Sequence, residues 1–345
     1  MRPEDQHFVP AGYLRSFRPD DQGGLFVRRR KGDKWFRQKP ENIATRKNFY
    51  SMLAEDGTFD DRIEHMLDRG IERPGLAALW QLKEGQTIPS WDTRTSIATF
   101  LAVQYTRVPD IRDNIHRLLG QVANVFADDI LEDKDWMAER LQQTEAIDRE
   151  RAEREARKLK ALVKAGHIRP AIKREASMKM LFNAVEDSAN GLAAMDWMVI
   201  VASEPSFFTS DIPIYVCPSV IGNKQIGIAT GGNVIHVPLS SRRFLLMGRM
   251  GYRSRQLPRL REILPDSFVS ELEKQPPVVS YLEADTEIIQ RLNLATAIFS
   301  GEWVCGPHGS EVMAHALGKP RVKGQYHVKR IDGELKIRHR HIVDE

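Results

Sequence analysis

A change of hydrophobic periodicity near Asp196 constrains the fold of this chain more than any other feature of its sequence. From about residue 60 to 192, apolar side chains recur every three or four positions, which predicts helices. Beyond Asp196, short apolar runs such as 197–201 are separated by Gly and Pro, which predicts strands. A hairpin signal also occupies residues 25–36. We therefore predict an α+β fold with an N-terminal β-hairpin region, a helical middle segment and a mixed β-rich C-terminal part.

The same pattern divides the 345 residues into three regions. Residues 1–58 form a strand and hairpin region, which we expect to pack on the C-terminal part. Residues 59–193 form a helical region that contains a charged helix over about 134–165. Because this helix has few apolar positions, we expect it to project with both flanks in water. Residues 194–345 form a β-rich region that ends in a hairpin around the turn Asp332-Gly333.

Proline, cap and alternation signals set the expected ends and faces of several elements. Pro74 should kink or end the first helix, and Pro109 should end the second and start the third. Later helices are predicted over 171–192 and 285–299, with Asp285 as the cap of the second of these. Further strands are predicted at 214–216, 226–229, 234–237 and 244–247. In the final hairpin, alternation places Tyr326, Val328, Leu335 and Ile337 on one face and His327, Lys329, Lys336 and Arg338 on the other.

The charge and the cysteine content indicate which cellular compartment and which class of partner to expect. The 51 basic and 47 acidic residues give a formal charge of +4, which by itself does not indicate nucleic acid. The only two cysteines, Cys217 and Cys305, favour a reducing compartment and inert thiols. The first residues lack the apolar core of a signal peptide, and no apolar run approaches the ~20 residues that span a membrane. We predict a cytoplasmic protein with no membrane contact.

Basic residues are concentrated in three segments, 28–47, 149–174 and 319–341, with net charges of +7, +7 and +6. Lys and Arg contacts to phosphates supply most non-specific affinity for nucleic acid. In segment 149–174 acids alternate with bases, which favours a solvated helix face over a binding surface. For the two hairpins both interpretations stay open, and the candidate contacts there are Arg29, Arg30, Lys329 and Arg338. The charged helix over 134–165 is a candidate surface for a protein partner.

Several short motifs resemble, in order, those of the bacterial domain-of-unknown-function family 4238. They are Gln6-His7-Phe8-Val9-Pro10, Gln104-Tyr105-Thr106-Arg107-Val108-Pro109, Phe208-Thr209-Ser210-Asp211-Ile212-Pro213, Pro238-Leu239-Ser240 and Leu292-Asn293. Val108 stands where the family usually has Thr, and Ile212 where it often has Asn, so any polar contact at those positions is missing here. The resemblance supplies no reaction, and it implies a bacterial protein with a role in phage defence.

The polar members of these motifs are the candidate site residues. His7 is the candidate general acid or base, Arg107 the phosphate clamp and Asp211 the group that orients the histidine. Gln104, Ser210 and Asn293 are candidate substrate-binding residues. Together they could cut a phosphodiester through a ribose 2′-hydroxyl, without a metal. The structural alternative is that each one bonds nearby backbone, as the Ser-Asp turn before a proline and the i, i+3 pair Gln104 and Arg107 suggest.

The first hypothesis is therefore a nucleic-acid-directed effector, a candidate metal-independent nuclease. The second is a non-catalytic binding or sensor module, and a third, weaker one is a hydrolase of a small phosphorylated molecule. Neither a cofactor nor a metal is expected, because the Cys305-x-x-His308 pair lacks further ligands and no phosphate-binding loop is present. Clustering of His7, Arg107 and Asp211 in an open cleft would favour an enzyme, whereas burial with complete hydrogen bonding would favour the second hypothesis.

Overall fold

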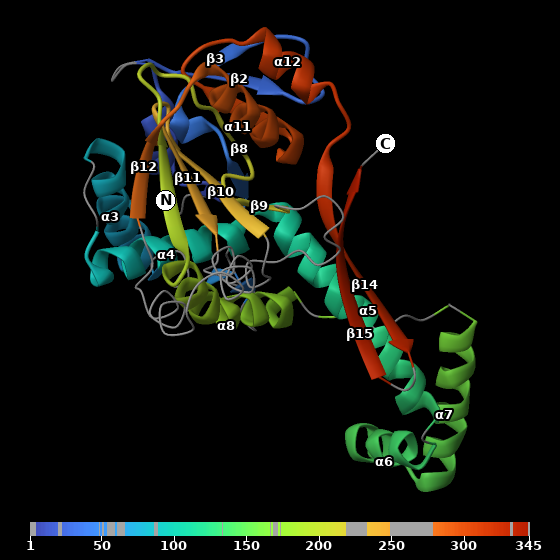
Figure 1. Cartoon of the computed structure of the whole chain (residues 1–345). Coiled ribbons are helices and arrows are strands. Elements are labelled where there is room, and N and C mark those ends of the chain that lie inside the picture. The colour runs from blue at the N-terminus through green and yellow to red at the C-terminus, as the bar shows by residue number, and fades with distance from the viewer. Residues whose placement is uncertain are drawn as a thin grey trace, which may run out of the picture.

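The computed structural model describes residues 5–19, 23–47, 49, 52–53, 59–60, 66–85, 89–132, 134–165, 167, 172, 174–218, 233–248, 279–331 and 334–343. Strands at both ends of the chain enclose a helical middle, which confirms the α+β class (Figure 1). None of the helices in these ranges is long and apolar enough to cross a membrane.

The N-terminal segment is built from short strands. Strand β1 (Asp5–His7) pairs with β4 (Thr45–Lys47), and β2 (Leu25–Arg29) pairs with β3 (Phe36–Gln38) in the predicted hairpin. Between them lie α1 (Ala11–Leu14) and the 3-10 turns η1 (Arg15–Phe17) and η2 (Pro40–Asn42), and a small pair, β5 (Met52–Leu53) and β6 (Phe59–Asp60), follows. Tyr13 and Leu14 of α1 and Phe17 of η1 are buried, which anchors this segment to the core.

A five-stranded sheet forms the centre of the molecule, in the order β12-β7-β11-β10-β9. Its strands are β7 (Asp196–Val201), β9 (Tyr215–Pro218), β10 (Asn233–Ser240), β11 (Arg243–Gly248) and β12 (Val279–Glu283). Neighbours are antiparallel except for the parallel pair β12 and β7. The strands predicted at 197–201, 214–216, 234–237 and 244–247 are confirmed, with the second one starting at Tyr215, whereas the one at 226–229 lies outside the described residues.

A four-stranded sheet, β3-β2-β13-β8, joins the two ends of the chain. Strand β13 (Trp303–Gly306) pairs on one side with β2 and on the other with β8 (Thr209–Ser210). All four residues of β13 are buried, because α11 (Thr286–Phe299) and α12 (Glu311–Leu317) cover this region (Figure 1). The predicted helix over 285–299 is confirmed, and Asp285 caps it by accepting a hydrogen bond from Ile288 N.

Three helices pack against the central sheet: α3 (Arg73–Glu84), α4 (Trp91–Arg107) and α8 (Arg174–Ala193) (Figure 1). The predicted helix over 171–192 corresponds to α8. Pro109 begins α5 directly after α4, as predicted, because its missing N–H is tolerated in a first turn. Pro74 lies in the first turn of α3, and the kink expected there takes the form of a π-helical turn, η3 (Asp68–Glu72).

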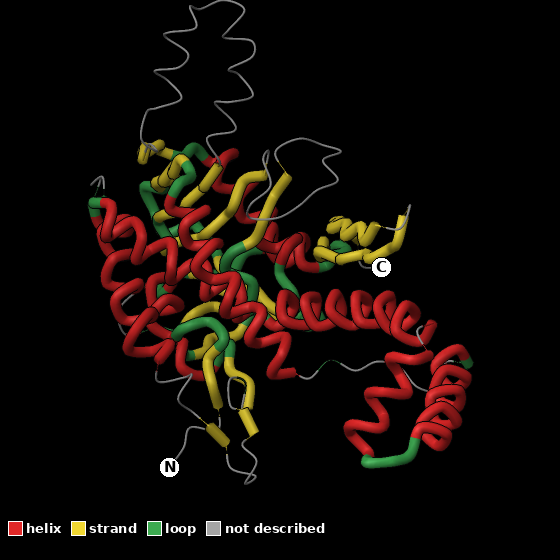
Figure 2. Tube along the Cα trace, turned by 90° about the horizontal axis from the view of Figure 1, so that it is seen from below, coloured by secondary structure: helices red, strands yellow, loops and turns green. Residues whose placement is uncertain are grey.

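The helical layer continues into an extension that leads away from the body (Figure 2). Helix α5 (Pro109–Glu132) leads to α6 (Lys134–Glu145) and α7 (Arg149–Lys164), which pack against each other through Met137, Ala156 and their apolar neighbours. The prediction of a single helix over 134–165 is therefore wrong. The break arises because Ala146 takes a left-handed φ of 51° and Asp148 caps α7 by accepting from Arg151 N.

The last described element is a two-stranded ribbon, β14 (Val322–Ile331) and β15 (Glu334–Val343), which lies along α5 (Figure 1). Its register pairs Val328 with Ile337 and Lys329 with Lys336, which confirms the predicted faces. The turn Asp332-Gly333 itself lies outside the described residues. Side-chain amides of α5 hold the ribbon's edge, since Gln121 Nε2 donates to Tyr326 O (3.1 Å) and Gln121 Oε1 accepts from Val328 N (2.9 Å).

Candidate functional site

The C-terminal turns of α4 fasten the first strand through two of the candidate residues. Arg107 Nη2 donates to His7 O (2.6 Å), and Gln104 Nε2 donates to Phe8 O (2.7 Å). Arg107 Nη1 also forms an ion pair with Glu72 Oε1 at 2.5 Å, and both partners are largely buried. The sequence analysis gave such backbone bonding by Gln104 and Arg107 as the structural alternative to a role in substrate binding. The two side chains connect the end of α4 to the first strand.

The His7 side chain lies beside this tie and is partly buried. Burial lowers the pKa of His7, while Glu41 and Glu72 act in the opposite direction and Arg107 reinforces the decrease. The imidazole is therefore more readily neutral than an exposed histidine, as a general base requires.

Asp211 directs its hydrogen bonds to other elements of the fold. Its carboxylate accepts hydrogen bonds from Gly301 N (2.9 Å) and Glu302 N (2.7 Å), at the turn between α11 and β13. Burial raises the pKa of Asp211 to about 7, and the two backbone amides oppose that increase. Gly301 leaves no room for a side chain, because a Cβ there would stand 2.5 Å from Asp211 Oδ2.

Ser210 and Asn293 complete the same structural unit. Ser210 Oγ donates to Ile212 O and accepts from Ile212 N, which is the local turn expected for a serine before Asp-x-Pro. Asn293 Oδ1 accepts from Phe208 N (3.1 Å), and its Nδ2 donates to Ser206 O (2.8 Å). The motif at residues 208–213 is thus held between α11 and β13 by Ser210 and Asp211 of its own and by Asn293 of α11.

The structure brings His7, Gln104 and Arg107 together and places Asp211, Ser210 and Asn293 in a second group. The charged side chains that act on His7 are Glu41, Glu72 and Arg107, whereas those that act on Asp211 are Asp110 and Glu302. Within the described residues, no hydrogen bond or ion pair joins Asp211 to His7 or Arg107. The catalytic assignment of these three residues stays a prediction.

Of the predicted nucleic-acid contacts, Arg30 forms its hydrogen bonds with the protein itself. Its guanidinium donates to four backbone carbonyls and one hydroxyl, those of Leu317, Lys319, Ala297 and Ser300. Arg29 on β2 and Lys329 on β14 are exposed. Arg338 lies opposite His327 in the ribbon's register, and its side chain is outside the described residues.

The basic segments differ in how their charges are paired. On α7, acidic neighbours one turn away form ion pairs with Arg149, Arg154, Arg157 and Lys158. On the ribbon, Lys329 and Lys336 are cross-strand neighbours, and the one ion pair that either makes within the described residues joins Lys336 Nζ to the exposed Glu334 at 3.6 Å. Within the described residues, Lys329 and Lys336 therefore have fewer acidic partners than these bases of α7.

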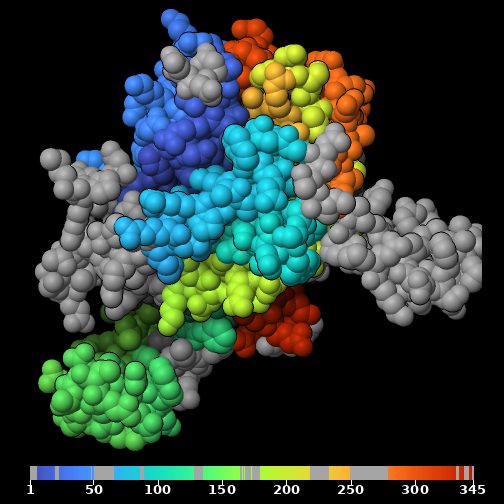
Figure 3. All heavy atoms as spheres, turned by 90° about the vertical axis from the view of Figure 1, so that its left-hand side faces the viewer, coloured from blue at the N-terminus to red at the C-terminus, as the bar shows by residue number. Residues whose placement is uncertain are grey.

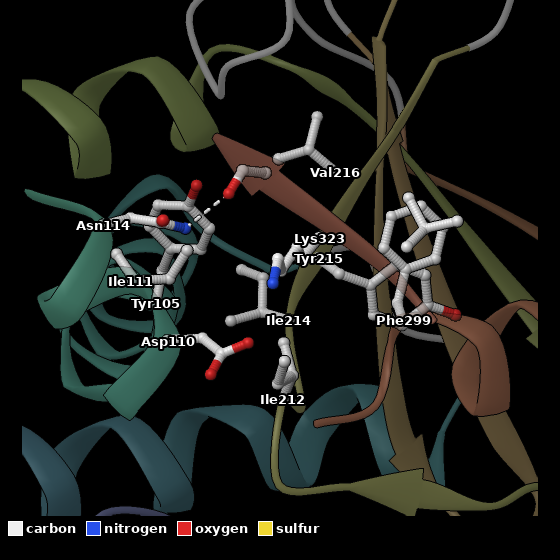
Figure 4. A pocket seen from close by; sticks show the side chains of 12 residues that line it. Tyr105, Asp110, Ile111, Asn114, Ile212, Ile214, Tyr215, Val216, Phe299 and Lys323 are labelled. Carbon is white, nitrogen blue, oxygen red and sulfur yellow. Dashed lines mark hydrogen bonds between the residues drawn. The ribbon is translucent and has the colours of Figure 1, made fainter. Parts of the chain in front are cut away.

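A small cavity lies where the ribbon meets the body (Figure 4). It holds about 50 Å³ between the start of α5, β9, the end of α11 and β14, and most of its lining is apolar. Asp110 and Lys323 project into it from α5 and from β14 (Figure 4). The volume suits water but not an organic substrate, since small-molecule sites measure about 300–1,000 Å³.

Potential metal ligands do not gather in the described part of the chain, where no group of three or more His, Cys, Asp or Glu side chains could hold an ion. Burial raises the pKa of both cysteines, that of Cys217 to about 11. His308 makes an edge-on ring contact with Phe208, at 5.3 Å between ring centroids.

These features define an α+β protein in which polar motif residues tie the two β-rich ends of the chain to the helical layer. The chain belongs to the family described as protein of unknown function DUF4238, whose match covers residues 5–309. This confirms the resemblance seen in the motifs. No curated protein and no solved structure matches the chain.

Two features of the structure escaped the sequence analysis. Asn114 and Gln121 stand seven residues apart on α5 and bind the backbone of β14, since Asn114 Nδ2 donates to Gly324 O (2.8 Å). Their spacing of two helical turns within an apolar stripe is the available signal. Lys83 is buried together with two apolar residues of the same helix, Leu79 and Leu82. The sequence feature that could have indicated this burial is a basic residue on an apolar helix face.

Proposed function

We propose that this protein is a nucleic-acid-binding effector that contacts phosphates through the exposed face of the β14–β15 ribbon. The observation that carries the proposal is the register of the ribbon, in which Lys329 stands directly opposite Lys336. Like charges at such positions destabilise a strand pair by roughly 0.2–1 kcal/mol. A bound polyanion would remove that repulsion, because each lysine would then face a phosphate.

The placement of the ribbon supports the same proposal. One face carries the half-buried Tyr326 and Val328, and the other presents His327 and Lys329 to solvent. A two-stranded ribbon has the width that the major groove of duplex DNA admits. Segment 319–341 has a net charge of +6, whereas on α7 the bases have acidic partners one turn away. A nucleic-acid partner also agrees with the cytoplasmic location expected from the sequence.

Cleavage is an outcome to be measured and not part of the proposal. Gln104 and Arg107 direct their hydrogen bonds to the backbone of the first strand, and Asp211 accepts from two backbone amides. This arrangement supports the binding hypothesis over the nuclease hypothesis. The role in phage defence stays a prediction from the family resemblance.

The test is fluorescence anisotropy with labelled single-stranded RNA and duplex DNA, in the presence of EDTA or Mg²⁺. The double variant Lys329→Ala/Lys336→Ala should weaken binding, whereas the matched control Arg157→Ala/Lys158→Ala removes the same charge from α7 and should bind like the wild type. Equal affinity of the ribbon variant and the wild type would refute the proposal. Gel analysis of the same samples, with His7→Ala as a control, detects any cleavage.

A further inference from the structure

A groove of about 840 Å³ opens between α1, α3 and the turn that joins β10 to β11. Its walls come from residues 12–19, 76–84, 201–205 and 240–243. Figure 3 looks onto this side of the molecule, where the blue N-terminal residues, the cyan α3 and the yellow to gold strand ends meet. The volume lies in the range of small-molecule sites, about 300–1,000 Å³.

The described lining of this groove is strongly basic, with one acidic residue, Glu84, against five basic ones: Arg15, Arg18, Lys83, Arg242 and Arg243. Most of the arginines have partners outside it. Arg15 pairs with Glu41 at 2.7 Å, Arg242 with Glu204 at 3.4 Å, and Arg243 donates to the carbonyls of Leu82 and Gly85. Lys83 differs from them in its environment.

Lys83 is a buried ammonium that forms no ion pair with any residue the structure describes. The residue is 8% exposed, and its Nζ donates to Ser16 Oγ at 2.5 Å. The Nζ also lies 5.8 Å from the ring centroid of Tyr13, a distance at which a cation is attracted to the ring face. Among the described residues no carboxylate oxygen lies within ion-pair distance of it. A buried charge of this kind is costly unless something pairs with it.

An exposed aromatic side chain stands beside Lys83. Trp80 is 58% exposed, lines the groove and precedes Lys83 by three residues, so both side chains lie on one face of α3. An indole face stacks well on planar rings. The lining of the groove therefore combines a buried ammonium with an exposed aromatic ring.

We propose that this groove binds a nucleotide, with a phosphate group on the Lys83 ammonium and the base against Trp80. The site is separate from the β14–β15 ribbon, so it does not depend on nucleic-acid binding. Burial lowers the pKa of Lys83 to about 8, and its ammonium is therefore mostly charged at neutral pH. A phosphate bound there would stabilise the charged form, and affinity should fall as the pH rises above about 8.

The test is isothermal titration calorimetry of the full chain with adenosine monophosphate, ribose 5-phosphate and inorganic phosphate. Adenosine monophosphate should bind, and Lys83→Met should weaken it about tenfold or more, as expected for loss of a charged hydrogen bond. Trp80→Ala, a change at an exposed position, should weaken the nucleotide and leave ribose 5-phosphate unchanged. The control Lys158→Met removes a surface charge on α7 and should have no effect.

Each outcome decides the proposal. Absence of nucleotide binding to the wild type, or undiminished binding to Lys83→Met, would overturn the site. Equal affinity for the nucleotide and for inorganic phosphate, or no effect of Trp80→Ala, would overturn the nucleotide assignment. Thermal unfolding of each variant verifies that it is folded before titration, and Trp80→Ala keeps the test informative should Lys83→Met fail to fold.

Discussion

Replacing Lys83 should change the stability of the protein strongly, because its charge is buried and forms no ion pair within the described part of the chain. We predict that Lys83→Met stabilises the protein at neutral pH. Methionine keeps the length and the apolar stem of the side chain and removes the charge that burial disfavours. The hydrogen bond to Ser16 Oγ is lost, and the serine hydroxyl then turns to water in the groove.

The magnitude follows from the pKa of Lys83, which burial lowers from 10.5 to about 8. At about 1.4 kcal/mol per pKa unit, the charged form is disfavoured in the folded protein by about 3 kcal/mol. Loss of the Ser16 hydrogen bond offsets about 1 kcal/mol of this. The free energy of unfolding should therefore rise by about 2 kcal/mol in Lys83→Met at pH 7.

The sign of the pH dependence provides an independent check. Because the folded pKa of Lys83 lies below the unfolded one, the unfolded chain binds more protons between about pH 8 and 10.5, and wild-type stability gains from this residue as pH rises. The difference between Lys83→Met and the wild type should shrink by about 2 kcal/mol between pH 7 and about pH 9.5. Urea unfolding at both pH values measures it. A variant that is destabilised at pH 7, with a difference that does not change with pH, would refute the reasoning.

Three further predictions concern a helix packing contact, a buried ion pair and the hydrogen bonds that hold the ribbon. Gly75→Ala should lose about 1–3 kcal/mol of unfolding free energy, because its Cβ would overlap Phe100 where α3 crosses α4. Gly120→Ala on α5 has open space and should gain up to about 1 kcal/mol. Urea denaturation of both variants measures these changes, and equal effects would contradict the packing argument. Arg107→Ala leaves a buried carboxylate unpaired and should lower the melting temperature, by the equivalent of about 3 kcal/mol; an unchanged melting temperature would contradict this. Gln121→Ala removes the amide that binds β14, so limited proteolysis should cut the ribbon sooner while the body's melting temperature is unchanged, and wild-type protection would refute the tie.

Periodicity made most of the secondary structure predictable. Strands β7, β9, β10 and β11 of the central sheet and the capped helix α11 follow directly from apolar spacing and from Asp285, whereas strand β12 is not among the predicted strands. The helix over 134–165 was predicted as one element because its composition is uniformly charged. The break depends on a single left-handed residue, Ala146, and on the cap at Asp148, which are too local for a periodicity argument.

The candidate site was harder to predict for a different physical reason. A motif identifies polar side chains such as Arg107 and Asp211, but it does not say whether their hydrogen bonds go to the backbone or to a ligand. In the structure they go to His7 O and to the amides of residues 301 and 302. The environment of Lys83 depends on α1 and the β10–β11 turn, which are distant in sequence and meet only after folding.

The salt dependence of nucleic-acid binding tests the central claim most directly. For duplex DNA the slope of log affinity against log salt counts phosphate contacts at about 0.9 per contact. If Lys329 and Lys336 each neutralise a phosphate, the slope of their double alanine variant should be less steep than that of the wild type by about 2. The Arg157→Ala/Lys158→Ala control should keep the wild-type slope. Identical slopes for the ribbon variant and the wild type would contradict the account.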